Sequence, residues 1–72
     1  MPISNRVSFV IFLIHCLATA WKKQPPEVYG LLKSSGALDR YVLKHFEVLH
    51  SMGERYLVDD LTNYLKIRGV TI

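Results

Sequence analysis

The first twenty or so residues carry the most apolar pattern in the chain. Apolar residues recur there at the three- and four-residue spacing of a helical face, and a second apolar flank runs beside that face. Ser4 can cap this helix, which we expect to run to about Lys23. Because most of its circumference is apolar, the helix is expected at the centre of the fold. The face comprises Ile3, Val7, Val10, Ile11, Ile14, Leu17, Ala18 and Trp21, and the flank comprises Phe9, Leu13, Cys16 and Ala20.

Two further helices are predicted in the middle of the chain. The Gln-Pro-Pro break at residues 24–26 ends the first helix, and Pro26 suits the first turn of a second one. That helix should stop at Gly36, a good left-handed cap. A third helix is expected over about Leu38 to Phe46, with its end left open.

The fourth helix has the clearest start and stop signals. Ser51 and Glu54 have the spacing of a capping box, with serine at the cap and glutamate three residues later. Gly69 follows the last apolar position as a stop signal. The buried stripe is expected to comprise Leu57, Val58, Leu61, Tyr64 and Leu65.

These elements predict an all-α fold: one domain over residues 1–72, built as a single small bundle of about four helices with the hydrophobic N-terminal helix at its centre. A chain of 72 residues buries only about 60% of its unfolded surface. Its one cysteine, Cys16, can form no intrachain disulfide and is expected to be a buried thiol. Half of the residues are hydrophobic, so we expect a protein partner or a homo-oligomer to cover part of the surface.

The N-terminus also imitates a secretion signal, with Arg6 before an apolar run and Ala-Thr-Ala at residues 18–20. His15 interrupts that run, and cleavage would leave a short remainder without cysteine. The dense apolar stretch from Phe9 to Ile14 is too short to span a bilayer. We therefore expect a cytoplasmic protein with no membrane segment.

The net charge of +3 permits contact with nucleic acid without requiring it, because the basic residues are interleaved with acidic ones. A small helix-turn-helix-like nucleic-acid-binding regulator is the alternative function. Residues 34–36 would form its turn, and Arg40 and Lys44 would face phosphates. Asp39 and Glu47 flank the same segment and oppose this hypothesis.

No motif of an enzyme, a nucleotide-binding loop or a metal site is present in the sequence. His45 and His50 are five residues apart and do not share a helical face. Asp59 and Asp60 are adjacent, so on a helix their carboxylates diverge. We expect no enzyme, cofactor or metal. Asp60 is expected to accept a hydrogen bond from a neighbouring element, with His50 as a candidate donor, and the alternative is a contact of His50 with the backbone.

Aromatic residues at helical spacing are typical of core edges and also of interfaces. The flank bearing Phe9, Leu13 and Cys16 is where we expect a second chain to bind. The candidate partner-binding residues are Phe9, Leu13, Tyr41, His50, Tyr56, Asp59 and Asp60.

Residues 41–70 resemble a family of short bacterial helical proteins described only as a domain of unknown function. The resemblance rests on Val48-Leu49-His50, followed by Val58-Asp59-Asp60, and extends to residues 28–36. Ser51 stands where the family commonly has threonine. The resemblance implies a small helical protein with no known catalytic residue, and some members are encoded beside genes resembling ADP-ribosyltransferase toxins. The function expected from both arguments is a non-enzymatic protein-binding module, an antitoxin-like or accessory component of a toxin–antitoxin-type operon.

Overall fold

A computed structural model describes residues 5–72, so the expectations for Ile3 and Ser4 lie outside the described residues. The described chain is all-α and contains no strand, which confirms the predicted fold class. Its radius of gyration of 11.4 Å is that of a compact chain of this length. The elements are α1 (Asn5–Trp21), α2 (Pro25–Ser34), the π-helical turn η1 (Leu38–Val42), α3 (Phe46–Leu49) and α4 (Glu54–Ile67).

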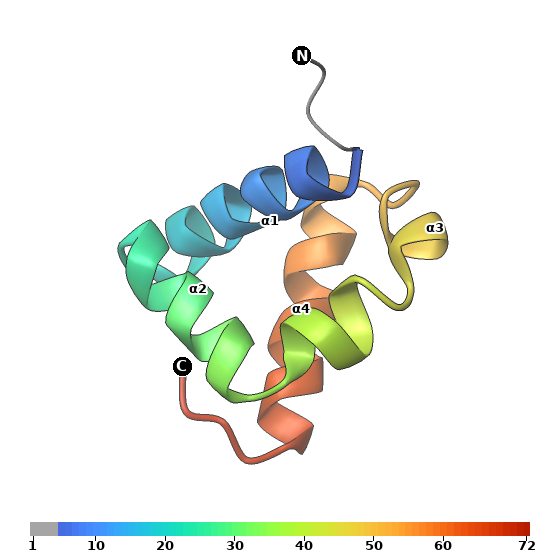
Figure 1. Ribbon diagram of the computed structural model, residues 1–72. Helices are drawn as coiled ribbons and strands as arrows, with labels where there is room; N and C mark the ends of the chain where they lie inside the picture. Colours follow the sequence, from blue (N-terminus) through green and yellow to red (C-terminus); the bar gives the residue numbers. More distant parts are fainter. Residues whose placement is uncertain (1–4) are drawn as a thin grey trace.

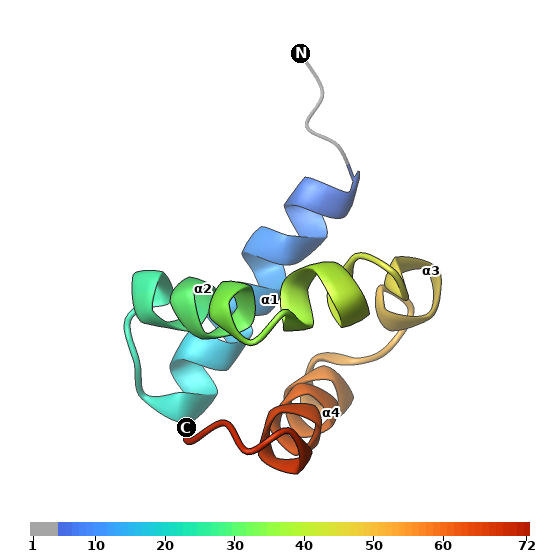
Figure 2. The same cartoon turned by 60° about the horizontal axis from the view of Figure 1, so that its bottom comes forward.

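Helix α1 packs against both α2 and α4, which are the other two long helices (Figure 1). Helix α2 crosses α1 at a steep angle, and η1 continues from α2 before the chain reaches α4. When the molecule is turned, the first turns of α1 extend past the layer formed by α2 and η1 (Figure 2). The C-terminal half of α1 is therefore the better covered half.

The core is made of leucines from every helix. Leu13 and Leu17 of α1 have no exposed surface, and neither do Leu61 and Leu65 of α4. The buried set also contains Val28, Leu32, Ala37, Leu38, Val42, Leu49 and Leu57. The indole Nε1 of Trp21 donates a 2.9 Å hydrogen bond to the Thr62 hydroxyl, which joins the end of α1 to α4.

A residue with positive φ lies just after each of the three long helices, α1, α2 and α4. Gly36 and Gly69 both have φ of +80°, as the stop signals in the sequence predicted. The amide of Val70 bonds to the Leu65 carbonyl at 2.9 Å, so the end of α4 is a Schellman motif. Lys22 has φ of +56° and takes the same position after α1, although lysine has a Cβ that disfavours this conformation.

The predicted third helix was wrong as a continuous element. The amide of Leu43 bonds to the Leu38 carbonyl, five residues back, so the segment begins as a π-helical turn. The chain then turns at residues 43–45 and resumes as α3 at Phe46. The described part of the chain, residues 5–72, consequently contains five helical segments where about four helices were expected.

The predicted capping box was also wrong. Gly53 is the N-cap of α4, in extended conformation with φ of −70° and ψ of 159°. The Ser51 hydroxyl instead donates a 2.7 Å bond to the Val48 carbonyl, behind it in the chain. Glu54 is thereby the first residue of α4 and lies favourably beside the positive end of its dipole.

The last residues form no strand and pack on the bundle, where Val70 and Ile72 contact the core cluster. Within residues 5–72, no helix has both the length and the hydropathy needed to cross a membrane.

Candidate protein-binding surface

An apolar ridge runs along the N-terminal half of α1. Val7, Ile11 and Phe12 are 49%, 47% and 48% exposed, and these three residues define the α1 ridge. Val7 and Ile11 are one helical turn apart and share a face, while Phe12 lies about 100° around the helix. Single exposed apolar residues are ordinary, but here three lie within two turns of one helix, with the exposed polar residues Ser8 and His15 between Ile11 and Phe12 around the helix.

A hollow of about 320 Å³ borders the α1 ridge on the side of α2 and η1. We call it the η1 hollow. Among the described residues that line it, Arg6 is the charged one, and Tyr29 of α2, which is 45% exposed, is the other residue with a polar group. The remaining lining side chains are Val7, Val10, Ile11, Ile14, Leu38 and Leu43.

The π-helical turn brings Leu38 of η1 and Leu43, the residue that follows η1, to this hollow. Leu38 and Leu43 are five residues apart, and in a regular α-helix they would point about 140° away from each other. The wider turn closed by the Leu43 amide and the Leu38 carbonyl, at 2.9 Å, aligns them on one side. Leu38 then forms the buried floor, and Leu43 is a half-buried wall.

A second hollow, of about 480 Å³, lies on the other side of the ridge, between α1 and α3. We call it the α3 hollow. The Phe46 ring is its centre: it meets the Phe9 ring edge-on at 5.6 Å and stacks on the His50 ring at 4.7 Å. The Arg6 guanidinium lies 5.2 Å from the centre of the same ring. Ser8, Phe12 and Glu47 complete the lining.

The flank expected to bind a second chain is largely the inner side of α1. Leu13 has no exposed surface and Cys16 is only 7% exposed, so neither can meet a partner, and the expectation for Leu13 was wrong. Phe9 is half-buried against Phe46. Ile11, expected to face the bundle, is exposed instead. The apolar pattern covers so much of α1 that periodicity alone does not distinguish the two sides.

Tyr41 and Asp60 do lie together, as part of an aromatic cluster between η1 and α4. The Tyr41 hydroxyl donates a hydrogen bond to a carboxylate oxygen of Asp60. The Tyr41 ring stacks on Tyr64 at 4.2 Å, and the Arg68 guanidinium lies 4.6 Å from the Tyr64 ring centre. Burial, and then the Asp60 carboxylate, raise the pKa of Tyr41 to about 12. Asp60 therefore has the expected bond to a neighbouring element, and its function there is to hold η1 on α4.

The donor to Asp60 is Tyr41 and not His50, which corrects the candidate pairing. Nδ1 of His50 is 3.0 Å from the Phe46 carbonyl, so the alternative of a backbone contact is the one the structure shows. Tyr56 is 69% exposed on α4, apart from both hollows. The partner-binding candidates are thus dispersed, and only Phe9 and His50 border the same hollow beside the ridge.

A comparison with protein families identifies the chain. Residues 8–68 match the family described as "Protein of unknown function (DUF3791)". The chain belongs to this family. No curated protein matches it, and no solved structure matches it. The matched residues include Ile11 and Phe12 of the α1 ridge, while Val7 precedes the match.

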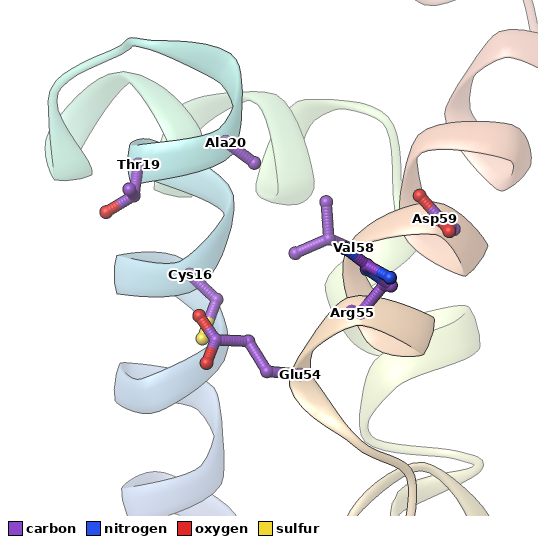
Figure 3. A pocket seen from close by; sticks show the side chains of 7 residues that line it. All are labelled: Cys16, Thr19, Ala20, Glu54, Arg55, Val58 and Asp59. Atoms are coloured by element: carbon purple, nitrogen blue, oxygen red, sulfur yellow. The ribbon is translucent and has the colours of Figure 1, made fainter.

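The third hollow of this DUF3791 domain, about 400 Å³ between α1 and α4, is the one with most functional groups (Figure 3). The Glu54 carboxylate points toward Cys16, and Arg55 and Asp59 line the opposite side. Burial, and then the charge of Glu54 and its hydrogen bond, raise the pKa of the Cys16 thiol. A nucleophilic cysteine needs the opposite shift. Among the described residues, no group of three or more histidine, cysteine, aspartate or glutamate side chains could hold a metal ion.

Proposed function

We propose that this DUF3791 domain is a protein-binding module that binds its partner with the α1 ridge. The observation that carries the proposal is the exposure of Val7, Ile11 and Phe12 within two turns of α1, each at the lining of one of the two hollows. A ridge with flanking grooves is the surface that a helix of another protein packs against. The sequence predicted exposed apolar surface on the flank of Leu13. Leu13 is buried, and the exposed apolar residues of α1 are those of the ridge.

The partner we propose is the product of an adjacent gene. This part rests on the resemblance to short bacterial proteins encoded beside toxin-like genes, and it makes the chain an antitoxin-like or accessory component of such an operon. Binding by an apolar ridge is consistent with that role, because an antitoxin acts by covering a surface of its target. It requires no reactive group, and the raised pKa of the Cys16 thiol fits a chain whose chemistry is limited to contact.

The alternative nucleic-acid regulator receives no support from the geometry. Its recognition helix was the segment following Gly36, and that segment is the five-residue turn η1. A recognition helix contacts base edges with residues from successive turns, which η1 does not have.

The test is site-specific photo-crosslinking in the native cell. A photoreactive phenylalanine analogue replaces Phe12 in one strain and Ile67 in another, since Ile67 is 86% exposed at the far end of α4 and serves as the matched position. We expect a discrete crosslinked product from position 12 and none from position 67, identified by mass spectrometry as the product of the adjacent gene.

The purified pair then gives the quantitative result. Ile11→Asp should weaken binding at least about tenfold, because it places a charge within a buried apolar contact, while Ile67→Asp should change it less than about twofold. Equal effects of the two substitutions, or crosslinks that are as abundant at position 67 as at position 12, would refute the proposal.

A further inference from the structure

We draw no further inference here: the strongest candidate, the η1 hollow beside the α1 ridge, is an apolar face, and nothing in the structure shows what covers it.

Discussion

The hydrogen bond between Tyr41 and Asp60 is the polar contact that holds η1 on α4, and Tyr41→Phe removes it while keeping the ring. The substitution leaves stacking on Tyr64 in place, so the loss isolates the hydroxyl. A hydrogen bond to a charged group contributes about 1.5–3 kcal/mol when shielded from water. Because Tyr41 is half-buried, solvent screening reduces this, and we expect a loss of about 1 kcal/mol.

The assay is urea and thermal unfolding, each followed by far-UV circular dichroism, on the wild type, Tyr41→Phe, Asp60→Ala and the double variant. A loss of about 1 kcal/mol in a domain of this size lowers the melting temperature by about 4–8 °C. The coupling energy from the double-mutant cycle should be close to the loss caused by Tyr41→Phe alone. Additive effects of the two substitutions, within about 0.3 kcal/mol, would show that the bond does not stabilise the fold.

The same pair predicts how stability changes at high pH. The folded pKa of Tyr41 is about 12, above the value of about 10 for an unfolded tyrosine. The unfolded chain therefore releases this proton first, so the contribution is complete below pH 10 and is lost as pH rises to 12. The stability advantage of the wild type over Tyr41→Phe should narrow across that window. An advantage that stays constant from pH 9 to pH 12 would contradict the assignment.

Three further substitutions test the packing by thermal or urea unfolding. Lys22→Gly should stabilise the domain by about 0.5–1 kcal/mol, since glycine accepts the φ of +56° without a Cβ clash, and a lower melting temperature would count against this reading. Leu61→Ala should cost about 2–5 kcal/mol because the side chain is fully buried, whereas Ile67→Ala, 86% exposed, should cost under about 0.5 kcal/mol. Trp21→Phe should cost about 1 kcal/mol through loss of the bond to Thr62, and a neutral effect would show that the bond is replaced by water.

Helices α1, α2 and α4 could be predicted because their signals are local. Apolar spacing, the Gln-Pro-Pro break, Gly36 and Gly69 each act within one or two turns of the chain, and the structure has helices and stops at these places. The segment between Gly36 and α4 could not be predicted in the same way. The apolar spacing of Leu38 and Val42 is the same in an α-helix and a π-helical turn, and the choice depends on how the segment fits against α1 and α4.

The site was predicted less well than the fold, for a related reason. A capping box at Ser51 is a local pattern, but the short helix α3 ends at the same point and supplies the Val48 carbonyl as a competing acceptor. Tertiary packing decides which side of α1 faces solvent, and the spacing of apolar residues does not specify that packing. One sequence signal of the η1 hollow was available. Leu38 and Leu43 are five residues apart, a spacing that does not align two side chains on one face of an α-helix.

The path of α2 explains why the exposed ridge lies at the N-terminal half of α1. Three residues separate α1 from α2, so α2 starts beside the C-terminal end of α1. It then crosses α1 and does not run along it, so the first turns of α1 extend past it (Figure 2). The segment beyond α2 is the short turn η1, which covers Val10 and Ile14 in part and leaves the η1 hollow beside Ile11.

The chain beyond α2 also leaves the ridge uncovered. Gly36, at φ of +80°, stops the chain from continuing α2, and the π-helical turn then directs two leucines toward the gap without filling it. Gly36→Ala should therefore destabilise the domain by about 1 kcal/mol, because alanine has a Cβ that disfavours a φ of +80°. Urea unfolding followed by far-UV circular dichroism measures the loss. A stability equal to that of the wild type would show that Gly36 does not need this conformation to end α2.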